Sequence, residues 1–175
     1  EYRAGMGTSM TAIVIKGDKY FFGNVGDSRG YIIDQDIIIQ FTKDHTLANS
    51  LFEAGVIKEK DASKGFTEGN LLTKAIGLKA NVIVDVPHSY LTIEKNQRIL
   101  LCSDGLYKVV PEPEIQKMVN QYRSLPKVCK KLIEKANFYG GPDNITVLIA
   151  SMGDRKAKSV FYRRLFSFYT KDFVK

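Results

Sequence analysis

The sequence predicts an α+β fold built on antiparallel β-sheet. Segments with the β-branched, apolar composition of strands outnumber segments with helical spacing, and the expected helices cluster between strands. Short turns join the strands near the start of the chain, which indicates antiparallel pairing. The chain has 175 residues, of which 44% are hydrophobic, and this suffices for one domain with a packed core.

The first forty residues are expected to form an antiparallel meander. Its strands are predicted at residues 8–15, 19–25, 31–33 and 37–39. The pattern changes at Asp44, after which apolar residues recur at helical spacing, and Gly55 stands where a helix would stop. Residues 58–70 are polar and include glycine, so a loop is expected there.

Strands and helices are both predicted in the remainder of the chain. The expected strands are residues 82–86, 99–102 and 145–150. The expected helices are residues 112–122 and 125–136. Each of these helices has a proline near its start, where the missing N–H group would have no partner within the helix.

We divide the chain into a domain at residues 1–153 and a basic, aromatic tail at residues 154–175. The tail holds seven Lys or Arg against two Asp, whereas the domain holds 19 basic against 17 acidic residues. A nucleic-acid-binding protein usually carries its basic excess on the folded body, so no nucleic-acid partner is expected. Four apolar residues of the tail recur at helical spacing; they are Phe161, Leu165, Phe168 and Tyr169. The alternatives for such a helix are contact with its own domain, with a partner protein or with an anionic membrane surface.

Three aspartates stand where predicted strands meet loops. Asp104 follows the apolar run at residues 99–102, Asp143 precedes the last strand, and Asp27 lies between two strands of the meander. A carboxylate at the end of a buried strand is unfavourable unless it meets a cation or several hydrogen-bond donors. Taken alone, Asp104 is more typical of an ordinary turn and each of the other two is a weak signal, but together they predict an all-oxygen site for Mg²⁺ or Mn²⁺.

Other kinds of site lack their usual signals. His45 and His88 have no second His or Cys at zinc-ligand spacing. The chain contains neither a glycine-rich nucleotide-binding loop ending in Gly-Lys nor a Gly-x-Ser-x-Gly motif. Two cysteines, Cys102 and Cys129, cannot build a disulfide framework, and they fit a reducing, cytoplasmic location.

Five motifs, in order along the chain, carry a resemblance to a known family. They are Met6-Gly7-Thr8-Ser9, Val25-Gly26-Asp27-Ser28-Arg29, Asp44-His45, Leu101-Cys102-Ser103-Asp104-Gly105-Leu106 and Gly140-Gly141-Pro142-Asp143-Asn144-Ile145-Thr146. From about Gly5 to Ala150, the chain resembles the metal-dependent serine/threonine protein phosphatases of the protein phosphatase 2C (PPM) type, in the style of bacterial members.

The resemblance implies a β-sandwich with helices on its outer faces and two Mn²⁺ or Mg²⁺ ions at one end. It also implies that a metal-bridging water attacks the phosphorus of phosphoserine or phosphothreonine in a protein. By the motifs, Asp104 and Asp143 would be direct ligands of one metal, and Asp27 would stand at the position of a third, weaker metal.

The same resemblance assigns supporting roles. Arg29 and Asn144 would be neighbours of the metal site, and Asn144 would hold Asp143 in place through a hydrogen bond. Gly105 would let the backbone turn away and leave space beside the carboxylate of Asp104.

The sequence departs from the family in two places. Family members carry an N-terminal portion with an aspartate that bridges both metals and an arginine that binds phosphate, and this sequence begins too late to contain either. We therefore expect the N-terminal part of the domain to be missing, weak or no hydrolysis by the chain alone, and a dimer through unpaired strand edges. The second departure is Lys108, where many members have an acidic residue. It argues against a third metal and leaves Asp27 the alternatives of an ion pair with Lys108 or with Arg29.

The resemblance predicts metal-dependent hydrolysis of phosphoserine and phosphothreonine in proteins. The partner would be a phosphoprotein substrate, and the enzyme would oppose a serine/threonine kinase in cytoplasmic signalling. The alternative is a non-catalytic relative with the same fold that binds or regulates another protein.

Overall fold

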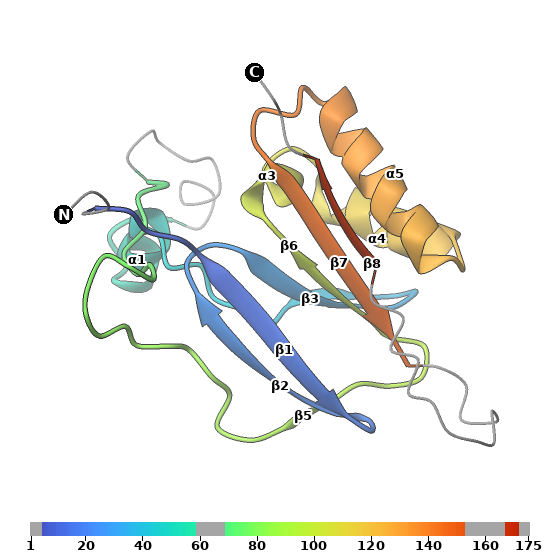
Figure 1. Ribbon diagram of the computed structural model, residues 1–175, viewed down its shortest axis with the longest axis horizontal. Helices are drawn as coiled ribbons and strands as arrows, with labels where there is room; N and C mark the ends of the chain where they lie inside the picture. The colour runs from blue at the N-terminus through green and yellow to red at the C-terminus, as the bar shows by residue number, and fades with distance from the viewer. Residues whose placement is uncertain (1–4, 59–68, 153–166, 172–175) are drawn as a thin grey trace.

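Two antiparallel sheets lie face to face in the protein (Figure 1). The computed structural model describes residues 5–58, 69–152 and 167–171. The smaller sheet has the order β1-β2-β5, with β1 (Met10–Lys16), β2 (Lys19–Val25) and β5 (Leu91–Thr92). The larger sheet has the order β4-β3-β6-β7-β8, with β3 (Arg29–Ile33), β4 (Ile38–Gln40), β6 (Arg98–Cys102), β7 (Ile145–Ser151) and β8 (Ser167–Lys171).

The central strands of the larger sheet are buried on both faces. Along β6, Ile99 and Leu101 pack into the cluster between the two sheets, whereas Leu100 and Cys102 pack into the cluster beneath the helices. Successive side chains of a strand point to opposite faces, so this alternation is the expected one. Burial on both faces explains why β6 and β7 are continuous apolar runs in the sequence rather than alternating ones.

Two helices, α4 (Glu112–Gln121) and α5 (Leu125–Phe138), cover the outer face of the larger sheet (Figure 1). Their buried residues recur every three or four positions, as in Val128, Cys129 and Leu132 of α5, and this stripe packs on β3, β6 and β7. The predicted sandwich with flanking helices is confirmed. Within the described ranges, no helix combines the length and the apolar character that crossing a bilayer requires.

The short helix α1 (Leu47–Glu53) follows the meander, where the sequence predicts a helix. The hydroxyl of Thr46 accepts a hydrogen bond from the Asn49 N–H at 3.3 Å and begins the helix. Gly55 adopts φ of +71°, the left-handed conformation that ends many helices, so the predicted stop is confirmed. The loop predicted at residues 58–70 lies mostly outside the described residues.

Three segments differ from the sequence-based prediction. Residues 82–86 are not a strand: Ile83 is 77% exposed, and Asp85 alone pairs with the backbone of Asn24, in an isolated bridge. The helix inferred from the apolar spacing of the tail does not form at residues 167–171, which form β8 and pair with β7. The rest of the tail is outside the described residues. Asp104, for which an ordinary turn is one alternative, begins a short helix, α3 (Asp104–Tyr107).

Candidate metal centre

The loops that carry the three aspartates meet at one end of the larger sheet. In the register of the sheet, Arg29 at the start of β3 lies opposite Cys102 at the end of β6, and Cys102 lies opposite Val147 near the start of β7. The loop before β3 holds Asp27, α3 after β6 begins with Asp104, and the loop before β7 holds Asp143. Antiparallel pairing therefore brings residues that are up to 116 positions apart to a common edge.

The segments of Asp104 and Asp143 are tied together directly. Ser103 Oγ donates to Asn144 O at 3.0 Å and accepts from the Thr146 N–H at 2.9 Å. A methyl group at Gly105 would lie 2.4 Å from Asn144 O, so only glycine allows α3 to pack this closely on the loop before β7. These contacts fix the backbones of the two segments side by side.

Asp143 itself is exposed and is held by its neighbour in the chain. Its Oδ1 accepts a hydrogen bond from the Asn144 backbone N–H at 2.6 Å. Asn144 thus contacts Asp143 through the backbone, and its carbonyl faces α3 through Ser103. For the other oxygen, Oδ2, the structure records no hydrogen bond to the described residues. A carboxylate oxygen in this state is suited to bind a metal ion.

The loop of Asp27 is fixed from two sides. Gly26 has φ of +103°, and a methyl group there would lie 2.3 Å from Ser9 Cβ, so the chain just before β1 passes directly beside the loop. From the other side, Tyr107 Oη donates to Asp27 O at 2.9 Å. Burial and the nearby charge of Asp104 raise the pKa of Asp27, while Lys108 opposes this shift.

Lys108 stands between Asp104 and Asp27. Its Nζ lies 2.6 Å from Asp104 Oδ2 and 4.0 Å from Asp27 Oδ2. Of the two ion pairs considered for Asp27 in the sequence, the structure shows the one with Lys108, although Asp104 is the nearer partner. Arg29 pairs elsewhere.

Arg29 binds Asp44 in the arrangement that gives the strongest ion pairs. Its Nη2 and Nε lie 2.7 and 3.0 Å from Asp44 Oδ2, and its guanidinium stacks on the Tyr107 ring at 3.7 Å. Burial alone would lower the pKa of Arg29, but the hydrogen bond to Asp44 and neighbouring charges raise it overall. Arg29 therefore stays charged and joins β3 to α3 through the Tyr107 ring.

A second ion-pair cluster supports the Asp27 loop from the side of β2. The Nδ1 of buried His45 accepts from the Gly26 N–H at 3.0 Å, which leaves its proton on Nε2, and Nε2 donates to Asp85 Oδ2 at 2.8 Å. Lys74 Nζ lies 2.7 Å from Asp85 Oδ1. Although burial would raise the pKa of Asp85, the bonds from Lys74 and His45 lower it overall.

Replacing His45 with alanine should destabilise the protein by about 1–3 kcal/mol, because it leaves the buried Gly26 N–H without an acceptor and removes one donor from Asp85. Urea unfolding measures the change in free energy. His88→Ala is the matched control, since His88 is exposed and its loss should change stability by less than about 0.5 kcal/mol. Equal effects of the two substitutions would contradict this account of the loop.

The donors at this edge suit a hard divalent cation, but they are few. Carboxylate oxygens are what Mg²⁺ and Mn²⁺ prefer, and Asp104 and Asp143 supply them from adjacent segments. Among the residues that the structure describes, no three His, Cys, Asp or Glu side chains form a metal-binding group. A six-coordinate ion would therefore need further oxygens from water or from parts of the protein beyond the described residues.

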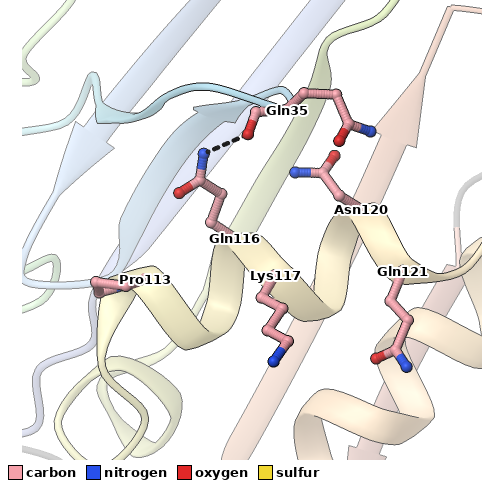
Figure 2. Close-up of a pocket in the computed structure, with 6 residues that line it drawn as sticks. All are labelled: Gln35, Pro113, Gln116, Lys117, Asn120 and Gln121. Atoms are coloured by element: carbon pink, nitrogen blue, oxygen red, sulfur yellow. Dashed lines mark hydrogen bonds between the residues drawn. The ribbon is translucent and has the colours of Figure 1, made fainter.

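A groove of about 450 Å³ lies elsewhere, beside α4 (Figure 2). It runs along the side of α4 that faces the turn between β3 and β4. Gln116 Nε2 donates to Gln35 O at 3.3 Å across it. Its lining is polar and lacks carboxylates; the lining residues are Gln35, Pro113, Gln116, Lys117, Asn120 and Gln121. The groove offers no carboxylate to a metal ion.

The sequence assigns supporting roles to Arg29, Asn144 and Gly105, but it does not identify the other residues that support the site. The motif Asp44-His45 was recognised without a role, and Lys74 and Asp85 were not singled out. One signal was present: Asp85 is a lone charge within the apolar segment of residues 82–86. The stacking of Tyr107 on Arg29 has no counterpart in the sequence, because 78 positions separate the two residues.

Comparisons with known proteins agree with this architecture. Residues 3–54 match the family described as protein phosphatase 2C. The serine/threonine phosphatase stp of Listeria innocua is 39% identical over 145 residues, which are 83% of this chain and 56% of that protein. The crystal structure of the Mycobacterium tuberculosis serine/threonine phosphatase PstP/Ppp superposes with a TM-score of 0.75 at 33% identity, over 83% of this chain and 60% of that one.

A further solved structure bears on the metal. The catalytic domain of the serine/threonine protein phosphatase PstP, in complex with two manganese ions, matches with a TM-score of 0.71 at 33% identity, over 83% of this chain and 58% of that one. The chain spans somewhat more than half the length of the relatives it matches. The ordered motifs, the sandwich and these relatives agree, and the chain belongs to the protein phosphatase 2C family.

Proposed function

We propose that this chain forms part of the catalytic domain of a metal-dependent protein serine/threonine phosphatase. The observation that carries the proposal is the meeting of the Asp104 and Asp143 segments at one end of the larger sheet, held by Ser103 and by the close packing of Gly105. The serine/threonine phosphatases among the relatives support the same activity.

The proposed role of Asp104 and Asp143 is to hold a divalent cation through carboxylate oxygens. When bound, Mn²⁺ or Mg²⁺ would supply a water nucleophile near neutral pH and neutralise charge on the phosphoryl oxygens. The chain's own contribution is rigidity: Gly105 and Ser103 fix the two segments, and Arg29 ties α3 to β3. Ligands held in this way need little rearrangement when they bind an ion.

The described residues provide only part of a ligand set, so we expect robust turnover from a protein that supplies the remaining ligands and weak turnover from this chain by itself. The substrate class is a phosphoprotein carrying phosphoserine or phosphothreonine, placed there by a serine/threonine kinase. We place the activity in the cytoplasm, where two reduced thiols such as Cys102 and Cys129 are stable.

The test is Mn²⁺-dependent hydrolysis of a phosphothreonine peptide by the protein that contains this chain. Phosphate release should require Mn²⁺, stop with EDTA and resume when Mn²⁺ is added in excess. A phosphotyrosine peptide of the same sequence should be hydrolysed more slowly. Failure to release phosphate by a folded protein that binds Mn²⁺ would refute the proposal.

One observation favours a second candidate, a non-catalytic relative that binds a partner protein. Lys108 already occupies Oδ2 of Asp104, and within the described ranges no third metal-binding side chain joins Asp104 and Asp143. A protein of this kind would bind phosphopeptide without hydrolysing it, and the same assay, with binding measured alongside phosphate release, separates the two candidates.

A further inference from the structure

Two carboxylates at the sheet edge face one positive charge. Asp27 and Asp104 come from different loops, and their side chains are 14% and 23% exposed. Lys108 Nζ lies 2.6 Å from the Oδ2 of Asp104 and 4.0 Å from the Oδ2 of Asp27. Asp143 is not part of this group, which therefore differs from the position at which Asp104 and Asp143 would share an ion.

Two partly buried carboxylates repel each other unless a cation lies close to both. Oxygen-rich pairs of this kind commonly hold a divalent ion in proteins. Here the protein supplies the positive charge itself, because Lys108 follows Asp104 by four positions and its side chain returns along α3.

The ammonium group is held in place by the anchoring of α3. Within α3, the side chain of Leu106 is fully buried, and the Tyr107 hydroxyl donates to the backbone oxygen of Asp27 at 2.9 Å. The Lys108 N–H donates to Asp104 O at 3.1 Å, so the backbone at Lys108 is also fixed. A divalent ion between Asp27 and Asp104 would meet this ammonium at close range and would be repelled by it.

We propose that Lys108 is a tethered cation that fills the place of a divalent ion between Asp27 and Asp104, so that this pair of carboxylates binds no Mn²⁺ or Mg²⁺ in this protein. The inference touches the proposed function only through Asp104, whose Oδ2 is engaged by Lys108 while Oδ1 stays available for the ion shared with Asp143. Metal binding at the sheet edge is then confined to the Asp104–Asp143 position.

The proposal is tested by counting bound Mn²⁺ ions per full chain, through the electron paramagnetic resonance signal of free Mn²⁺ during titration. Lys108→Met, which keeps the length and removes the charge, should bind an additional Mn²⁺ ion relative to the parent. The double variant Lys108→Met/Asp27→Asn should lose that ion again. Lys108→Arg and the exposed-lysine variant Lys95→Met should bind as the parent does.

A second measurement does not depend on how well the Lys108 variants fold. Asp27→Asn in the parent should leave the number of bound Mn²⁺ ions unchanged, because Asp27 holds none. Loss of an ion in this variant, or an unchanged count in Lys108→Met, would overturn the proposal. Absence of Mn²⁺ binding by the parent would count against the proposed function, whereas the gain in Lys108→Met is judged relative to the parent and tests this inference separately.

Discussion

Replacing Asp104 or Asp143 with asparagine should lower the Mn²⁺-dependent phosphatase activity of the protein by roughly 100-fold or more. An amide has nearly the same volume as a carboxylate but offers a metal ion only one neutral oxygen. A bound metal contributes several kcal/mol to stabilisation of the transition state, and about 2.7 kcal/mol corresponds to a factor of 100 in rate. Initial rates of phosphate release from a phosphothreonine peptide at saturating Mn²⁺ measure the effect.

Asp36→Asn is the matched control for these substitutions. Asp36 is exposed in the turn between β3 and β4, at a distance from the sheet edge that carries Asp104, so its loss should leave the rate unchanged. Circular dichroism at matched temperatures checks that each variant is folded. Retention of full, Mn²⁺-dependent activity by both Asp104→Asn and Asp143→Asn would show that neither residue is a metal ligand.

Replacing Arg29 with methionine should destabilise the protein by about 2–4 kcal/mol, because it leaves the carboxylate of Asp44 partly buried without its main partner. Asp44 is 14% exposed, and Gln40 would remain as one of its few donors, at 2.9 Å. The same change removes the cation that stacks on Tyr107 and links β3 to α3. Urea unfolding followed by circular dichroism gives the free energy of unfolding.

The ion pair between Lys43 and Glu53 provides the comparison for Arg29. Its atoms lie 2.6 Å apart, but its side chains are 51% and 44% exposed, so Lys43→Met should cost less than about 1 kcal/mol. The double variant Arg29→Met/Asp44→Asn should be more stable than Arg29→Met alone, since it removes the uncompensated charge. If Arg29→Met is no more destabilising than Lys43→Met, the Arg29–Asp44 pair stabilises the protein no more than an exposed ion pair does.

The elements that sequence predicts well are those fixed by local pattern. Continuous apolar runs such as residues 99–102 and 145–150 became β6 and β7, and the turn signal at Gly55 ended α1 as expected. The strand predicted at residues 82–86 does not form, because β-branched composition indicates a strand only where a neighbouring strand supplies hydrogen-bond partners along its length. Asp85 alone meets such a neighbour, and the apolar side chains around it remain exposed.

The candidate site also has residues that the sequence predicts and contacts that it does not. Asp27, Asp104 and Asp143 could be identified because each lies in a short motif at the end of a strand. Arg29 could be named as a support, but its partner Tyr107 and the His45–Asp85 pair could not, because these contacts join distant segments of the chain. Likewise, the four-residue spacing of Asp104 and Lys108 is visible in the sequence. The distances of the Lys108 ammonium from Asp104 and from Asp27 depend on how α3 packs.

Asp104 and Asp143 are proposed to bind one divalent cation together. Anomalous X-ray diffraction from crystals of the protein soaked in Mn²⁺ tests it most directly, because the manganese signal locates the ion without reference to activity. We expect an anomalous peak within ligand distance of a carboxylate oxygen from each of the two residues. A peak confined to other residues, or no peak in crystals that remain ordered at saturating Mn²⁺, would show that the two aspartates do not share an ion.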